Sequence, residues 1–108
     1  MKTIEGQQER GFRGAAYQYI RASDRLPVRT QGDSLALVKL FNPCGVGSWY
    51  LAEYDPEERE AFGLCDIQEA ELGYVSMAEL VSYRGAYGLP IERDLHWTPR
   101  PLSQCPGS

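Results

Sequence analysis

One histidine and a few closely spaced carboxylates are the side chains of this sequence whose type and spacing suit acid–base chemistry. A serine–histidine or cysteine–histidine mechanism would have to use His96. That residue stands between Leu95 and Trp97 in an alternating segment, and no nucleophile motif such as G-x-S-x-G accompanies it. The pattern therefore favours a partly exposed strand residue over a catalytic base.

Paired carboxylates offer a second route to general acid and base catalysis. Glu53 and Asp55 would share one face of a strand, and Glu92 and Asp94 would share a face of another. The run from Glu92 through Arg93 to Asp94 is also compact enough for local ion pairing. Because carboxylates are common in strands and turns, we assign no catalytic residue, and an enzyme using these groups or His96 stays an alternative.

The cysteines and glycines indicate neither a metal site nor a cofactor. The chain has an odd number of cysteines at wide spacing, namely Cys44, Cys65 and Cys105. This argues against a disulfide framework and against a CxxC metal site. We expect reduced thiols, with Cys65 buried in a strand and Cys105 in a frayed tail. The glycines form neither phosphate-binding pattern, G-x-x-x-x-G-K-[ST] or G-x-G-x-x-G, so they indicate turns.

Acidic side chains are concentrated in residues 53–71, within a chain of net charge −4. Arg59 is their only basic neighbour. Such a block repels nucleic acid and suits a basic partner, although charge runs are more often a solvated rim of hairpin loops. Its eight members are Glu53, Asp55, Glu57, Glu58, Glu60, Asp66, Glu69 and Glu71.

Aromatic residues are numerous for a chain of 108 residues. Trp49, Tyr87 and Trp97 lie next to glycine or proline loops, where either a partner interface or the core would suit them. The acidic neighbours and the lack of an RNP-type motif argue against stacking on single-stranded nucleic acid. Core positions are expected for Phe41, Phe62 and Tyr74.

The first 34 residues are expected to form an N-terminal helical segment and a loop. A short helix over residues 15–23 would place Ala16, Tyr19 and Ile20 on one face. Pro27 and the polar residues 30–34 then break the chain.

Residues 35–102 are expected to form the core of a single domain, followed by a flexible tail at 103–108. Strands are predicted at 35–41, as a central strand covered on both faces, and at 48–54, 61–66 and 71–75. Residues 91–97 alternate and could add a fifth. A helix at about 77–84 is predicted by the capping pair Ser76 and Glu79, with Gly85 as its stop.

The fold class is therefore α+β: an antiparallel sheet of four to five strands with an N-terminal helix and the capped helix. We expect nine apolar residues to be buried, namely Leu37, Leu40, Phe41, Leu51, Phe62, Leu64, Leu72, Val75 and Leu80. No apolar run is long enough to span a membrane, and the first ten residues lack the apolar core of a signal peptide. We therefore expect a cytoplasmic protein.

From Leu37 to about Leu102 the chain resembles the family known as domain of unknown function 2958. The similar pieces include residues 49–56, WYLAEYDP, residues 71–76, ELGYVS, and residues 88–97, GLPIERDLHW. The resemblance implies a small protein of plasmids, integrative elements and phages. It supplies no activity and no catalytic residues.

These observations lead to the hypothesis of a non-enzymatic binding protein of a mobile genetic element. It would inhibit host defence, as an anti-CRISPR protein does, by contacting a defence effector protein with a basic surface. We expect a monomer or small homo-oligomer, with no membrane contact and no nucleic acid as direct ligand. The alternatives are the small enzyme and a nucleic-acid-binding accessory protein using the basic segment Arg10 to Arg29. The expected interaction residues are Trp49, Glu53, Asp55, Glu57, Glu58, Glu60, Tyr87, Glu92, Arg93, Asp94 and Trp97.

Overall fold

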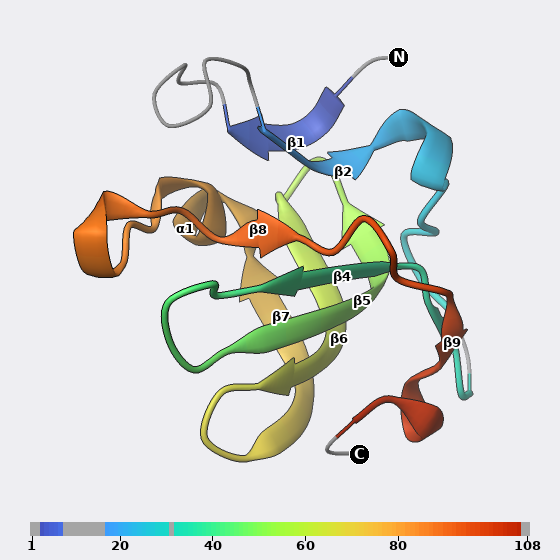
Figure 1. Cartoon of the computed structure of the whole chain (residues 1–108). Coiled ribbons are helices and arrows are strands. Elements are labelled where there is room, and N and C mark those ends of the chain that lie inside the picture. The colour runs from blue at the N-terminus through green and yellow to red at the C-terminus, as the bar shows by residue number, and fades with distance from the viewer. Residues whose placement is uncertain (1–2, 8–16, 31, 107–108) are drawn as a thin grey trace.

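The computed structural model describes residues 3–7, 17–30 and 32–106, and within these ranges the protein is mostly antiparallel sheet with one short helix (Figure 1). The strands are β1 (Thr3–Gln7), β2 (Tyr17–Arg21), β3 (Leu35–Ala36), β4 (Val38–Phe41), β5 (Ser48–Asp55), β6 (Glu60–Asp66), β7 (Ala70–Ser76), β8 (Glu92–Arg93) and β9 (Arg100–Pro101). The helix is α1 (Met77–Ser82), and 3₁₀ turns are η1 (Ala22–Asp24), η2 (Ala86–Gly88) and η3 (Leu102–Gln104). No helix of these ranges is long and apolar enough to cross a membrane.

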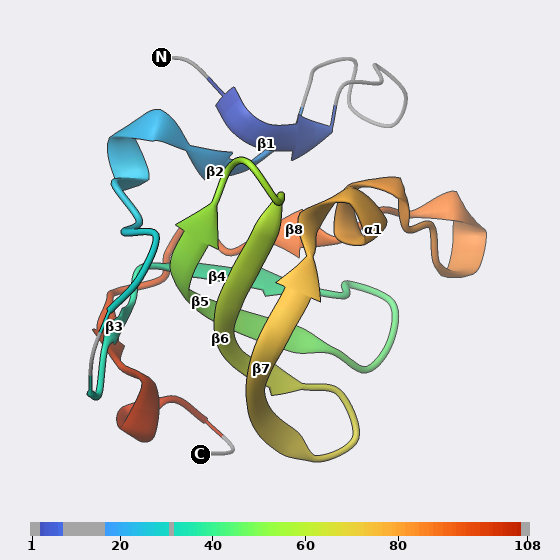
Figure 2. The same ribbon diagram turned by 180° about the vertical axis from the view of Figure 1, so that it is seen from behind.

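A five-stranded sheet in the order β7-β6-β5-β4-β8 forms the centre of the molecule. Its pairings are all antiparallel, and β4 to β7 follow one another as hairpins. Two further pairs, β1 with β2 and β3 with β9, complete the described strands. Figures 1 and 2 show the β1–β2 pair at one end of the central sheet and the β3–β9 pair at one side, near the C-terminus.

Alternation along β4, β5 and β6 sends apolar side chains to both faces of the central sheet and so creates two cores. One core is closed by β2 and α1, and it contains Tyr19, Ile20, Val38, Leu40, Trp49, Leu51, Tyr54, Ala61, Met77, Leu80 and Ile91. The other is closed by β3 and η3, and it contains Ala36, Tyr50, Ala52, Leu64, Leu102 and Cys105.

The predicted N-terminal helix is wrong where the structure can test it: Tyr17–Arg21 is strand β2, paired antiparallel with β1. Tyr19 and Ile20 are adjacent yet both fully buried. Successive residues of a strand point to opposite faces, so both faces of β2 are covered. The helical spacing of apolar residues was a poor guide here, because the deciding contact is with a partner strand distant in sequence. Residues 15 and 16 lie outside the described residues.

The stretch 35–41 is divided between two strands. Leu35–Ala36 pairs with β9, whereas Val38–Phe41 pairs with β5 and β8. The amide of Leu37, between them, donates to the carbonyl oxygen of Leu51 at 2.9 Å. The segment is thus a turning point between two sheets, and the single central strand that we predicted is only partly correct.

The capped helix is confirmed, although it is shorter than predicted. The Ser76 hydroxyl accepts a hydrogen bond from the amide of Glu79 at 3.3 Å, as an N-cap residue does. The helix ends at Ser82, and Tyr83 is already extended, two residues before Gly85.

Burial follows the prediction for some residues and departs from it for others. Leu40, Leu51, Leu64 and Leu80 are buried as predicted. Four others are half-buried: Leu37, Phe41, Phe62 and Val75. The prediction that Leu72 is buried is wrong. This residue is 60% exposed, because it lies on the outermost strand.

Part of the expected flexible tail is packed against the sheet. Leu102 and Cys105 are buried in the second core, and the amide and hydroxyl of Ser103 both donate to the carboxylate of Asp33. Residues 107 and 108 lie outside the described residues.

Candidate functional site

An apolar groove of about 570 Å³ lies on the face of β6 and β7 that the C-terminal segment only partly covers. Its floor is apolar, and Asp33 and Ser103 supply polar groups at its side. The lining residues are Gly32, Asp33, Phe62, Leu64, Ala70, Leu72, Leu102 and Ser103.

The register of β6 and β7 explains why these apolar side chains meet. Phe62 is paired with Tyr74, and Leu64 is paired with Leu72. Paired residues lie on the same face of a sheet, so the four side chains form one patch. The rings of Phe62 and Tyr74 have centroids 5.0 Å apart and are tilted by 56°, a favourable aromatic geometry.

The patch is open to solvent at its outer side. Leu72 is 60% exposed and Tyr74 is 56% exposed, although Tyr74 was expected in the core. The second core extends only as far as Leu64, with Phe62 and Ala70 partly buried against it. Contiguous apolar surface of this kind typically marks a binding site, so sequence reasoning missed the strongest candidate, Leu72 with Tyr74. In the sequence, Leu72 and Tyr74 alternate with Glu71 and Gly73, which is the pattern of a half-buried strand. The pattern does not tell which face of the strand is exposed, because that depends on the layer that packs against the sheet.

The acidic block is divided between the two ends of this patch. Glu57, Glu58 and Glu60 are exposed at the β5–β6 turn, with Asp55 half-buried beside them. The opposite end, the β6–β7 turn, carries Asp66, Glu69 and Glu71. The ends of the seven-residue strand β6 are about 20 Å apart at roughly 3.3 Å per residue, so the block forms two separate acidic clusters.

Glu53 belongs to neither cluster, because the residue is buried, with only 7% of its surface exposed. Its Oε2 accepts hydrogen bonds from the amide of Thr30 at 3.0 Å and from the Thr30 hydroxyl at 2.6 Å. The carboxylate therefore anchors the loop before β3. The interaction role that we expected for Glu53 does not suit this internal position.

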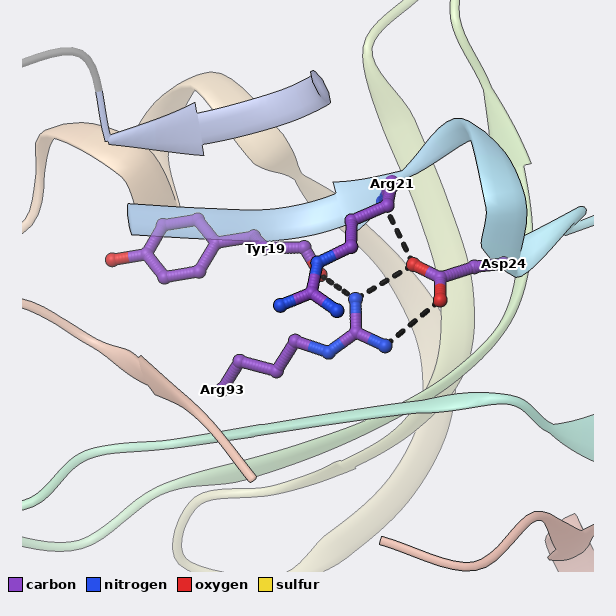
Figure 3. A network of polar contacts seen from close by, with 4 residues as sticks. All are labelled: Tyr19, Arg21, Asp24 and Arg93. Atoms are coloured by element: carbon purple, nitrogen blue, oxygen red, sulfur yellow. Dashed lines mark hydrogen bonds and ion pairs between the residues drawn. The ribbon is translucent and has the colours of Figure 1, made fainter. Parts of the chain in front are cut away.

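Arg93 and Asp94 are held in ion pairs with other parts of the chain. Arg93 Nη1 and Nη2 donate to the two carboxylate oxygens of Asp24 at 2.6 and 2.8 Å, and Nη1 also donates to the Tyr19 carbonyl oxygen at 3.0 Å (Figure 3). The Asp94 carboxylate lies 3.6 Å from Nζ of Lys39. Glu92, the third member of the run, is half-buried. These contacts thus connect the segment 92–94, which includes β8, to the N-terminal segment and to β4.

The pKa of Asp24 reflects opposing influences. Burial acts to raise it, but the Arg93 hydrogen bond, the Arg21 amide and both guanidinium charges together hold the pKa of this carboxyl below its usual value. The Arg21 amide donates to Oδ2 at 2.7 Å, and Figure 3 shows both arginines beside the same carboxylate. The bidentate ion pair and the additional amide hydrogen bond together stabilise the packing of β2, η1 and β8 against one another.

The three aromatic candidates have three different environments. Trp49 is buried in the first core. Trp97 is half-buried: its Nε1 donates to the Ala36 carbonyl oxygen at 2.8 Å, and its ring centroid lies 5.2 Å from that of Tyr50. Tyr87 is 95% exposed, in a left-handed conformation with φ of 61°. Of the three, Tyr87 is available to a partner without rearrangement.

His96 is exposed, and its amide donates to the Asp94 carboxylate at 2.9 Å, which closes a turn. Among the cysteines, Cys44 is exposed, Cys65 is half-buried and Cys105 is buried, all as free thiols. The described residues contain no group of three or more histidine, cysteine or acidic side chains that could hold a metal ion.

Two of the carboxylates named for the enzyme alternative have structural partners. Glu53 accepts hydrogen bonds from Thr30, and Asp94 is paired with Lys39.

Residues 14–105 match the family described as "Protein of unknown function (DUF2958)". This match covers most of the chain, so the protein belongs to that family, as its sequence motifs indicated. No curated protein and no solved structure matches it significantly.

Proposed function

We propose that this member of the DUF2958 family is a non-enzymatic binding protein that docks on a basic protein surface through the β6–β7 groove and the acidic clusters beside it. We further propose that it acts in the cytoplasm for a mobile genetic element and inhibits a host defence effector, as an anti-CRISPR protein does. The three free thiols suit a reducing compartment.

The observation that carries the proposal is the exposure of Leu72 and Tyr74 beside the apolar groove. Complete burial of a large apolar side chain is worth about 1.5–3 kcal/mol, and Leu72 and Tyr74, which are 60% and 56% exposed, leave roughly half of that free energy unrealised. A partner that covers both would recover that free energy on binding. Tyrosine is also frequent among the residues that dominate binding energy at interfaces.

The charge around the groove supports a basic partner. One cluster contains Glu57, Glu58 and Glu60, and the other contains Asp66, Glu69 and Glu71. Clusters of one sign accelerate encounter with an oppositely charged surface and repel like-charged molecules. A defence effector that binds nucleic acid would neutralise phosphates with lysine and arginine, and such a basic surface is complementary to these clusters.

The two alternatives have weaker support. The carboxylate of Glu53 accepts two hydrogen bonds from Thr30, and that of Asp94 is paired with Lys39. For nucleic-acid binding, Arg25 and Arg29 of the basic segment are exposed, but Arg21 is half-buried beside Asp24. Arg10 and Arg13 lie outside the described residues.

The proposal is tested by capture followed by a direct assay. The tagged chain is exposed to a lysate of bacteria carrying a nucleic-acid-cleaving defence system, and any captured effector is purified. Its cleavage rate is then measured with increasing amounts of the chain. We expect inhibition that saturates at a fixed stoichiometry, since a binding inhibitor is not consumed or turned over. Cleavage unaffected at saturating chain would contradict the inhibitory role.

Two exposed leucines provide a matched pair of variants. Leu72→Ala should weaken binding about tenfold, equivalent to 1.4 kcal/mol, whereas Leu95→Ala should leave it unchanged. Leu95 is 65% exposed but does not line the groove. Calorimetric titration of the captured effector with each variant makes the comparison. Equal affinities for the two variants would place the interface elsewhere.

The acidic clusters are tested by reversing Glu57, Glu58 and Glu60 to lysine. Association should slow, and the difference from the wild type should shrink in high salt, where exposed charges are screened beyond about 3 Å at 1 M. Stopped-flow association at two salt concentrations measures this. If wild-type and reversed chains associate at equal rates in low salt, the cluster is a solvated rim and the basic-partner assignment fails.

The enzyme alternative is separated from the proposal by His96→Ala. A binding inhibitor should retain its stoichiometric inhibition in this variant, because His96 lies outside the groove. Catalytic turnover that disappears with His96 would favour the enzyme.

A further inference from the structure

Strand β7 forms an edge of the central sheet. It is the first strand in the order β7-β6-β5-β4-β8, and within the described residues no strand pairs with its outer side. Figure 2 shows β7 at the margin of the sheet, leading into α1. A strand at an edge presents unpaired main-chain groups, which can accept a further strand.

One hydrogen bond fixes which main-chain groups of β7 face outward. The amide of Met77 donates to the carbonyl oxygen of Arg59 at 2.9 Å, in the register that pairs Ala61 with Val75. Hydrogen-bonded and non-hydrogen-bonded positions alternate along an antiparallel pair. Val75, like Met77, therefore directs its main chain to β6, and so do Gly73 and Glu71. The main-chain amides and carbonyls of Leu72 and Tyr74 face the free edge.

The same two residues also expose their side chains beside the groove. Leu72 and Tyr74 thus combine outward main-chain groups with apolar side chains on one face. An added strand would form main-chain hydrogen bonds at these positions, and every second side chain would lie beside Leu72 and Tyr74. Main-chain pairing with alternating side-chain contacts is the way that sheet edges recognise extended peptides.

Charge selects the kind of strand. Glu69 and Glu71 are exposed at one end of β7, and Glu60, paired with Ser76, is exposed at the other, with Glu79 in the first turn of α1. A second copy of the chain would bring the same acidic residues to this edge, and like charges facing each other are destabilising. A strand bearing lysine or arginine between apolar residues is complementary.

We propose that the partner's contacting element is an extended segment of alternating apolar and basic residues that adds to the free edge of β7. This inference rests on the proposed function and specifies the form of its partner. It adds a requirement that groove binding alone does not make: the main-chain amides of Leu72 and Tyr74 must become hydrogen-bonded.

Amide hydrogen exchange tests this requirement with internal controls. In the free chain, the amides of Leu72 and Tyr74 should exchange faster than those of Gly73 and Val75, which face β6. The probe is a capped eight-residue peptide of alternating lysine and valine, with glutamate in place of lysine as the charge control. Saturation with the lysine peptide should slow exchange at Leu72 and Tyr74 at least about tenfold, while the glutamate peptide leaves it unchanged.

A backbone variant separates strand addition from side-chain docking. Tyr74→Pro removes an outward amide without removing a bond to β6, a position where an edge strand tolerates proline. Tyr74→Ala removes the ring but keeps the amide. We expect Tyr74→Pro to weaken binding of the lysine peptide at least about threefold more than Tyr74→Ala. If Tyr74→Pro does not fold, the wild-type chain is titrated instead with two lysine peptides, each N-methylated on the amides of one of its two edges. Only the peptide whose methylated edge faces β7 should lose binding.

The outcomes distinguish this inference from the proposed function. Lysine-peptide binding that leaves the Leu72 and Tyr74 amides exchanging freely overturns strand addition, and so does the absence of peptide binding. Either result leaves effector binding through the groove to be judged by the Leu72→Ala comparison. Equal binding of the lysine and glutamate peptides overturns the charge selection. If exchange at Leu72 and Tyr74 slows when the concentration of the chain is raised without any peptide, the edge pairs with a second copy of the chain instead.

Discussion

Charged residues of this protein divide into those that hold the structure and those that remain in solvent. Arg93, Asp24 and Glu53 connect segments distant in sequence. Glu57 and Glu58 stay exposed in a turn. Sequence spacing grouped Arg93 with its neighbours Glu92 and Asp94, but its main partner is 69 positions away. Only the first group should affect folding strongly when substituted.

Substituting Asp24 should therefore destabilise the chain in a pH-dependent way. The side chains of this ion pair are each 12% exposed. Asp24→Asn leaves Arg93 without its counter-charge, and we expect the free energy of unfolding to fall by roughly 2–4 kcal/mol at pH 7. Urea unfolding monitored by tryptophan fluorescence measures the change.

The pH dependence follows from the lowered pKa of Asp24. Below the usual pKa, near 3.8, the unfolded chain binds a proton that the folded chain does not. The stabilisation is thus complete above about pH 5 and is lost as the pH falls through the folded pKa. The difference between wild type and Asp24→Asn should shrink toward pH 3, whereas the exposed control Glu58→Gln should match wild type at pH 7. A difference independent of pH would contradict the ion-pair explanation.

The three thiols should differ in reactivity toward Ellman's reagent in the folded chain. Cys44 is exposed, whereas burial raises the pKa of both Cys65 and Cys105 and reduces the thiolate available at pH 8. We expect one fast and two slow reactions, separated by at least about tenfold. Cys44→Ser should remove the fast reaction. Three equal rates without denaturant would show that Cys105 is not packed as described.

At the scale of elements, Gly63 allows β5 and β6 to approach closely beside an irregularity in their pairing. The pairing of β5 with β6 shifts by one residue between Leu51 and Glu53, beside Gly63. A Cβ atom at Gly63 would lie 1.8 Å from the Tyr50 carbonyl oxygen, so only glycine fits. Its partner on β7, Gly73, has open space at the same position. A β-bulge bends its strand and increases the local twist of the sheet.

These two paired glycines provide a sharp test of the bulge. Gly63→Ala should destabilise the chain by more than about 3 kcal/mol or prevent folding, because the contact is with main chain that cannot move aside. Gly73→Ala should be neutral or slightly stabilising, since alanine loses less conformational freedom than glycine in a strand. Thermal melts of both variants decide this, and similar melting temperatures would mean that the close approach at Gly63 is absent.

At the scale of the whole molecule, the C-terminal segment covers one face of the sheet. Leu102 and Cys105 fill the second core, and Asp33 accepts hydrogen bonds from Ser103. These bonds also hold the pKa of Asp33 below its usual value. The segment also forms one side of the groove, so it contributes both to the folded core and to the surface that we propose for binding.

Ending the chain at Pro101 should therefore destabilise the protein and open the groove. The loss of Leu102 alone should cost about 2–5 kcal/mol by analogy with cavity-forming substitutions. A chain ending at Pro106 retains Leu102 and Cys105 and should unfold at nearly the wild-type urea concentration. If both truncated chains are equally stable, the segment does not contribute to the core.

Local pattern in the sequence was sufficient for the elements made by neighbouring residues. The strands predicted at 48–54, 61–66 and 71–75 are observed with ends that differ by at most one residue, and the helix capped by Ser76 was also predicted. Alternation, turns and capping act over a few residues, so the sequence shows them directly. Sequence motifs also identified the family. The acidic block was visible in the sequence. It is divided into two clusters because the turns that carry these residues lie at opposite ends of β6.

Tertiary structure decided what depends on distant partners. Tyr17–Arg21 is a strand because β1 pairs with it, and Arg93 is internal because Asp24 reaches it. Leu72 resembles a core residue in sequence, yet it is exposed because β7 is an edge and the covering layer ends before it. Side-chain type fixes how much burial is worth, but which face is covered depends on how the layers stack. The groove that we propose as the binding surface is therefore a property of the assembled sheet.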